Sequence, residues 1–105
     1  MKNISFTDQA LKFLNEQSYE VRTAFEQAVN ELITEGRLHS PKAKVIAPNL
    51  YEIRVKDSHN QYRLFYCYFN PDGVLVLSGF VKKTQKTPPQ EIRKAKKIRK
   101  ENLGV

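Results

Sequence analysis

The chain has 105 residues, of which 40% are hydrophobic and 28% are charged. This length supports one domain with a single core, so residues 1–105 are treated as one unit. The longest apolar runs are about one strand long, which excludes a transmembrane helix, and the polar N-terminus lacks the apolar stretch of a secretory signal. The single cysteine, Cys67, cannot form an internal disulfide. Its place among aromatic residues favours a buried structural thiol in a reducing cytoplasm.

The charged residues are divided unevenly along the chain. Residues 1–36 carry three basic and six acidic side chains, whereas residues 37–105 carry fifteen and five, within a net charge of +7. A basic surface is therefore expected on the C-terminal part of the protein. Such a surface is typical of a protein that binds a phosphate backbone. A lysine-rich solubilising surface explains the charge alone equally well.

The first third of the chain has the pattern of two helices. Ser5 or Thr7 is expected to cap a short helix that runs to about Asn15, and Ser18 to cap a longer one. Gly36 fits the position that ends the longer helix. Its apolar residues recur at helical spacing: Val21, Phe25, Ala28 and Leu32.

The middle of the chain is predicted to form an antiparallel sheet. Residues 50–56 alternate between apolar and polar side chains, with Glu52, Arg54 and Lys56 on the polar side. Residues 62–69 are bulky on both faces, as in a central strand, and residues 74–81 form a third strand. Turn-forming residues separate the three segments, which indicates a meander. Residues 43–46 are a further candidate, for an edge strand.

A cluster of lysines follows the third strand, and a basic helix comes after it. Thr87 and Gln90 have capping-box spacing, with a proline at the first helical position. The lysines between strand and helix are Lys82, Lys83 and Lys86. Packing a core does not require cations at a strand end, and Arg54 and Arg63 lie in the two preceding strands. This arrangement predicts a site for a polyanion, with RNA as the first candidate.

Three segments together form a recognisable pattern: residues 50–54 (LYEIR), 62–66 (YRLFY) and 79–88 (GFVKKTQKTP). In this order and spacing they resemble the RelE/ParE superfamily of bacterial toxins, and specifically its HigB-like, phage-associated branch. The resemblance extends over about residues 7–100. It implies an α+β fold in which two N-terminal helices pack on a small antiparallel sheet, followed by a basic C-terminal helix.

The resemblance also implies a function. Members of this superfamily are typically toxins of type II toxin–antitoxin systems. Many are metal-independent endoribonucleases that need no cofactor and cleave mRNA on the ribosome. An antitoxin, usually of helix-turn-helix type in the HigB branch, binds and silences the toxin in a hetero-oligomeric complex. On this basis we expect a cytoplasmic protein with mRNA, the ribosome and an antitoxin as partners, and with no membrane association.

Metal-independent RNA cleavage uses the 2′-hydroxyl of the substrate as the nucleophile. The protein must position the phosphate, stabilise charge on its oxygens and handle a proton at each end. Arg63 is the first candidate for gripping the phosphate, because a guanidinium fork contacts two oxygens and because it matches the arginine of the family's Tyr-Arg-Leu motif. Lys83 matches the family's basic position at the strand end, and Arg54 completes the candidate catalytic set. The candidate RNA contacts are Lys82, Lys86, Lys56 and Tyr66.

Each of these assignments has a structural alternative. Arg63 can instead be an arginine paired with Glu52, and Arg54 can belong to a solvated face. The proton-transfer groups are not assigned: His39 and His59 fall in predicted loops, and Tyr66 is as well explained by the core.

Two other functions keep the same fold. One is a ParE-like inhibitor of DNA gyrase, and the other is a non-catalytic RNA-binding relic of a phage toxin.

Overall fold

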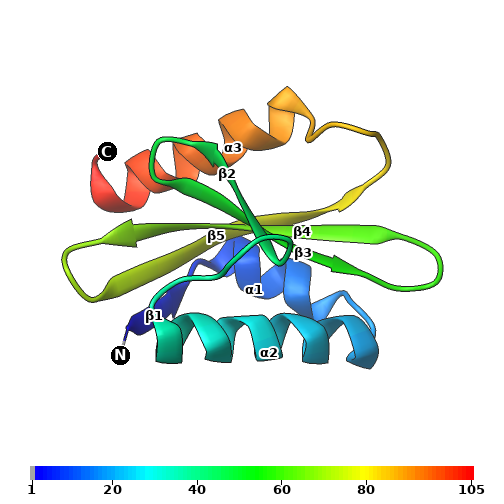
Figure 1. Cartoon of the computed structure of the whole chain (residues 1–105). Helices are drawn as coiled ribbons and strands as arrows, with labels where there is room; N and C mark the ends of the chain where they lie inside the picture. The colour runs from blue at the N-terminus through cyan, green and yellow to red at the C-terminus, as the bar shows by residue number, and fades with distance from the viewer. Residues whose placement is uncertain (1) are drawn as a thin grey trace.

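The computed structural model describes residues 2–105 and confirms the predicted α+β class. The helices are α1 (Asp8–Asn15), α2 (Tyr19–Glu35) and α3 (Pro89–Leu103). The strands are β1 (Asn3–Phe6), β2 (Ala43–Ala47), β3 (Leu50–Lys56), β4 (Gln61–Phe69) and β5 (Gly73–Lys82). Helices α1 and α2 cover one face of the sheet and α3 lies on the other (Figure 1). Among the described residues, none of the helices has the length and apolar character needed to cross a membrane.

The five strands form one sheet in the order β1-β5-β4-β3-β2. Strands β3, β4 and β5 form the predicted antiparallel meander, and β2 pairs antiparallel with β3, which confirms the edge-strand candidate. Strand β1 was not predicted. It pairs parallel with β5, so the sheet is mixed and not purely antiparallel. Ser5, one of the two predicted caps of the first helix, lies in this strand, and Thr7 is the cap of α1. A four-residue strand is specified by its distant partner rather than by its own pattern.

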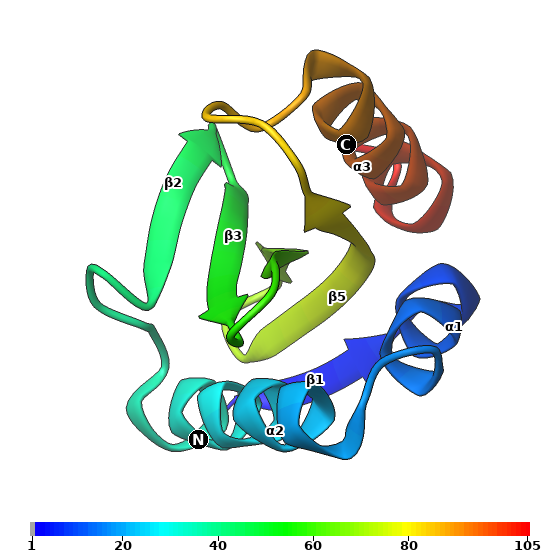
Figure 2. The ribbon, with the colours of Figure 1, turned by 90° about the vertical axis from the view of Figure 1, so that its right-hand side faces the viewer.

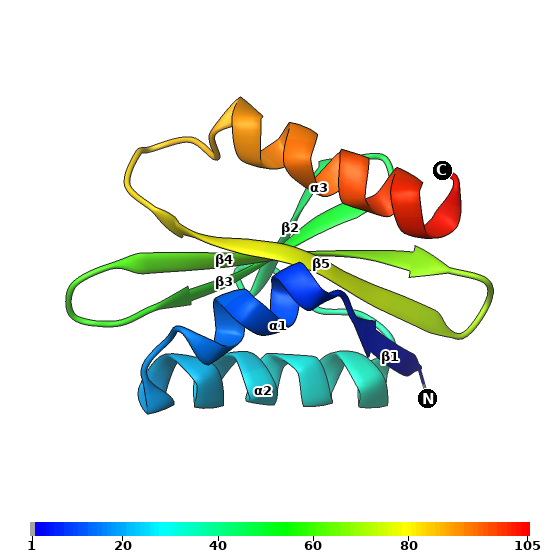
Figure 3. The same cartoon turned by 180° about the vertical axis from the view of Figure 1, so that it is seen from behind.

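Local capping signals set the boundaries of the N-terminal helices as predicted. The hydroxyl of Thr7 accepts a hydrogen bond from the Ala10 amide, and the Ser18 hydroxyl accepts one from the Val21 amide. Gly36 closes α2 with a φ of 82°, in the left-handed region that favours glycine. Figure 3 shows α1 and α2 together beneath the sheet, and the rings of Phe13 and Phe25 meet edge to face between them.

A β-bulge in β5 determines which side chains share a face of the sheet. Phe65 pairs with Ser78 but Tyr66 pairs with Val76, so Leu77 is an inserted residue. Side-chain alternation therefore changes phase at this point. As a result Phe80, two residues after Ser78, packs on the α3 side together with Leu77.

Helix α3 covers only part of its face of the sheet, as the view in Figure 2 shows. Ala95 and Ile98 pack on a compact apolar cluster that includes Leu50, Phe65, Cys67 and Leu77. This cluster confirms the prediction that the Cys67 thiol is buried. Towards the opposite end of strands β3, β4 and β5, the same face carries charged side chains instead.

The start of α3 differs from the prediction. Its N-cap is Pro88, which makes no side-chain capping bond, and Pro89 is the first helical residue. Thr87 does not cap the helix: its hydroxyl donates a hydrogen bond of 2.7 Å to Oε2 of Glu52. A buried carboxylate is a stronger acceptor than a neutral group, so the tertiary contact replaces the local one.

Candidate functional site

Cationic side chains converge on the end of the sheet that α3 leaves open. Two cross-strand rows build this surface: Arg54, Arg63 and Phe80 pair across β3, β4 and β5, and the next row holds Lys56, Gln61 and Lys82. We call the surface formed by Arg54, Lys56, Arg63, Lys82 and Lys83 the cationic face. A depression of about 380 Å³ opens over the first three of these residues.

Arg63 lies at the bottom of this depression with only 4% of its side chain exposed. Its Nη1 donates to the Tyr62 carbonyl oxygen at 3.0 Å, and its Nη2 donates to Oε1 of Gln61 at 2.7 Å. Burial lowers the pKa of Arg63, and the neighbouring Glu52 carboxylate opposes that shift. Because arginine starts from a very high pKa, the guanidinium stays charged in the neutral range.

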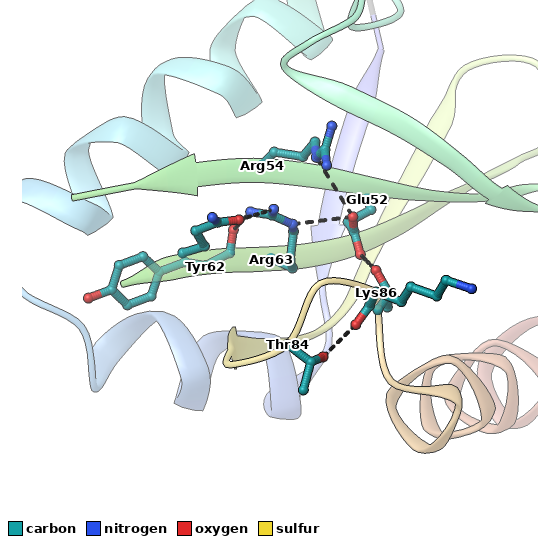
Figure 4. A network of polar contacts seen from close by, with 8 residues as sticks. Glu52, Arg54, Tyr62, Arg63, Thr84 and Lys86 are labelled. Carbon is teal, nitrogen blue, oxygen red and sulfur yellow. Dashed lines mark hydrogen bonds and ion pairs between the residues drawn. The ribbon is translucent and has the colours of Figure 1, made fainter. Parts of the chain in front are cut away.

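Glu52 pairs with Arg63 beneath the cationic face (Figure 4). Its Oε1 lies 3.3 Å from Nε of Arg63 and 4.0 Å from Nε of Arg54. The predicted alternative for Arg63 is thus present as a contact, but the same arginine also lines the depression. One carboxylate between two guanidinium groups leaves a net positive charge, which favours an incoming anion.

The three remaining cations of the face differ in their surroundings. Burial lowers the pKa of Lys82, and the positive charge of Arg63 adds to the shift. Nζ of Lys83 donates to Oδ1 of Asn60 at 3.2 Å. Lys56 lies between two depressions, since it also lines a second one of about 350 Å³ together with Lys82 and Lys83. The cationic face therefore continues from the sheet onto the β3–β4 turn.

Two residues that were predicted to contact RNA, Tyr66 and Lys86, lie outside the cationic face. Tyr66 is buried, with 1% exposed, in the core on the α2 side, where its ring stacks on Tyr51 at 5.2 Å. It faces away from Arg63, because successive residues of β4 alternate between the two faces. Lys86 is exposed in the loop before α3, and Figure 4 shows its side chain directed away from Arg63.

His59 lies on the cationic face, although no motif placed it there. It occupies the β3–β4 turn and lines the second depression with Lys82 and Lys83. The turn is held by Asp57, whose Oδ1 accepts the backbone N–H groups of His59 and Asn60. These hydrogen bonds, the one from Asn60 first, lower the pKa of Asp57.

Polar side chains hold the cations in place, and the sequence indicated only one of them. Glu52, Gln61 and Thr87 all contact the site through their side chains. Glu52 was predicted as the alternative partner of Arg63, and it is the only acidic residue between Glu35 and Asp57. Gln61 and Thr87 were not predicted at the site. Within residues 2–105, no three side chains of metal-binding type cluster.

The fold is that of a known class of toxins. It resembles the toxin of the intact Escherichia coli RelBE toxin–antitoxin complex, with 25% identity over 82% of this chain and 100% of that chain and a TM-score of 0.62. It also resembles a mutant of E. coli RelE in the free state, with 25% identity over 90% of this chain and 93% of that chain and a TM-score of 0.66. The fold is also similar to that of the isolated E. coli RelE toxin, with 24% identity over 93% of this chain and 99% of that chain and a TM-score of 0.61. The architecture is RelE-like.

The sequence specifies the family more closely. Residues 12–100 match the phage-derived Gp49-like proteins, so the chain belongs to the Gp49-like family. The expected resemblance to the RelE/ParE superfamily is thereby confirmed, and the phage-associated branch fits this family. A search of curated proteins finds no match.

Proposed function

We propose that the chain is the toxin of a type II toxin–antitoxin pair and that it cleaves mRNA on the ribosome without a metal ion. The observation that carries this proposal is the convergence of Arg54, Lys56, Arg63, Lys82 and Lys83 on one open face of the sheet. A phosphate between these groups would be held and its charge stabilised as the 2′-hydroxyl attacks.

The roles divide by burial. Arg63 has the most restricted orientation and is the candidate for gripping the scissile phosphate. The candidates for stabilising charge on the phosphate oxygens are Arg54, which pairs with Arg63 across β3 and β4, and Lys83, which directly follows β5. Lys82 and Lys56 extend the face along the RNA backbone, and Lys86 is a candidate contact at its margin.

The proton-transfer groups stay outside this assignment. His59 is a candidate for this step, because it lines the same depression as Lys82 and Lys83 and because an imidazole can accept or donate a proton. Tyr66 is not proposed for this step, since its ring lies in the opposite core and burial raises its pKa further from neutrality.

The partner we propose is a cognate antitoxin of helix-turn-helix type, in a hetero-oligomeric complex in the cytoplasm. The support is the RelE-like fold, since E. coli RelE occurs in a toxin–antitoxin complex. The positive cationic face suits an antitoxin segment rich in acidic residues.

The test is to express the chain alone in a bacterium and to map mRNA 5′ ends by primer extension. We expect growth arrest and new 5′ ends at defined positions within codons. Arg54→Ala combined with Lys83→Ala should abolish both effects. Lys12→Ala, which removes a charge from the exposed side of α1, should leave them unchanged. Intact mRNA with a DNA-damage response would indicate gyrase inhibition instead, and absence of arrest would refute the proposal.

A further inference from the structure

We propose that Glu52 is a positioning residue that couples the Arg63 guanidinium to the loop of residues 83–88 through the Thr87 hydroxyl. This inference rests on the proposed function, because it concerns how the cations of that site keep a fixed spacing. Nothing in the sequence motif assigns a role to Glu52 or to Thr87.

The two carboxylate oxygens of Glu52 contact two different parts of the chain. Oε1 lies 3.3 Å from Nε of Arg63 in β4, and Oε2 accepts the Thr87 hydroxyl at 2.7 Å. Glu52 itself belongs to β3, which lies between β4 and the edge strand β2. A single side chain therefore links two strands to the segment that leads into α3.

The loop depends on this link for its position over the sheet. At its beginning, Lys83 is attached to Asn60 through a 3.2 Å hydrogen bond, and at its end Thr87 is attached to Glu52. Between these points, Thr84 makes only an internal contact, with its hydroxyl donating to the carbonyl oxygen of Lys86. The Thr87–Glu52 contact thus fixes the end of the loop, whose other end carries Lys83.

The Arg63 fork is oriented by the same carboxylate. A guanidinium has five N–H groups. Nη1 and Nη2 each donate one to Tyr62 and Gln61, and Nε faces Glu52. Two N–H groups remain for a substrate, which matches two phosphate oxygens. Because three contacts hold the plane of the fork, little orientational freedom is lost when the phosphate binds.

Glu52 acts through its neighbours and not on the substrate. Its side chain is 1% exposed, and its two oxygens face Arg63 and Thr87. This burial keeps the carboxylate away from the open surface, so Glu52 is not proposed to take a proton from the 2′-hydroxyl. A carboxylate in this place is therefore suited to fixing the orientation of the Arg63 guanidinium and the position of the loop.

The first test compares three hydroxyl variants in RNA cleavage under saturating conditions. Thr87→Val removes the hydroxyl that reaches Glu52, Thr87→Ser keeps it, and Thr84→Val removes a hydroxyl of the same loop that does not touch Glu52. We expect Thr87→Val to lower the saturating rate about tenfold while binding of a non-cleavable 2′-deoxy RNA changes less than about threefold. Thr87→Ser and Thr84→Val should stay within about twofold of the original protein. A wild-type rate for Thr87→Val, with only a lower melting temperature, would overturn the inference.

The second test does not depend on catalysis. The ¹⁵N NMR signal of the Arg63 Nε–H reports directly on the group that faces Glu52. Thr87→Val should speed its exchange with solvent at least about fivefold, and Thr84→Val should leave it unchanged. An unaltered Arg63 signal in Thr87→Val contradicts the coupling even if no RNA is cleaved. Absence of cleavage by the original protein, with the signal altered as expected, would refute the proposed function alone.

Discussion

The carboxylate of Glu52 lies 3.3 Å from the Nε of Arg63, and both side chains are almost completely buried. Arg63 is thus both the best-oriented cation of the open face and one half of an interior ion pair. Removing one member of such a pair leaves the other charged, desolvated and unpaired. Loss of activity in an Arg63 variant therefore has to be separated from loss of folding.

Arg63→Ala is expected to abolish RNA cleavage and also to lower the free energy of unfolding by about 3 kcal/mol, because it leaves the Glu52 carboxylate without its nearest cationic partner. Urea denaturation measures the second effect. Arg63→Lys keeps the charge but loses the fork, so we expect a smaller stability loss and a cleavage rate about 100-fold lower. Equal stability of Arg63→Ala and the original protein would show that the ion pair is not formed.

Arg54→Ala should separate binding from stability. About a third of the Arg54 side chain is exposed (34%), and its Nε is 4.0 Å from Glu52. The free energy of unfolding should therefore change by less than about 1 kcal/mol. Binding of non-cleavable RNA should weaken, and the slope of log affinity against log salt should fall by about 1. Lys12→Ala serves as the control, and an unchanged slope for Arg54→Ala would remove Arg54 from the RNA surface.

Gly79→Ala tests the contact that holds α1 against the sheet. A Cβ at Gly79 would overlap the ring of Phe13, so one of the two layers must shift. We expect a loss of about 1–3 kcal/mol in the free energy of unfolding, measured by urea denaturation. Gly104→Ala is the matched control, because a Cβ there meets no atom within 4 Å and the cost comes only from a φ of 75°. A smaller loss at Gly79 than at Gly104 would contradict the packing.

Cys67 should be unreactive in the folded protein. Burial raises the pKa of its thiol from 9.0 to about 11, and the side chain has no solvent exposure. At pH 9 the thiolate fraction is then about one in a hundred instead of about a half. Alkylation by iodoacetamide at this pH should be slow until denaturant unfolds the chain, as mass spectrometry can follow. Rapid labelling without denaturant would show that α3 leaves this core open.

Much of the fold could be predicted because its signals are local. Thr7, Ser18 and Gly36 lie at the ends of α1 and α2 as their side chains and backbone preferences require. The turns around Asp57 and Asn70 likewise specify the meander. Strand β1 and the bulge at Leu77 could not be predicted, because each is defined by pairing with residues far away in the sequence.

The residues of the candidate site divide in the same way, into those with a local signal in the sequence and those defined by tertiary contacts. The motif and the strand pattern indicated Arg54, Arg63 and Lys83, and the structure brings them onto one face. Thr87 had the spacing of a helix cap, and only the tertiary structure shows that its hydroxyl is used by Glu52. Tyr66 had no signal in the sequence that could decide between core and surface, since β4 is apolar on both faces.

The central claim is that the cationic face cleaves RNA through the substrate's own 2′-hydroxyl. The most direct measurement compares an RNA with the same RNA carrying one 2′-deoxynucleotide at the cleaved position, with ribosomes supplied. We predict cleavage of the first, with new 5′-hydroxyl ends, and binding without cleavage of the second. Cleavage of the 2′-deoxy substrate, or products with 5′-phosphate ends, would contradict the claim.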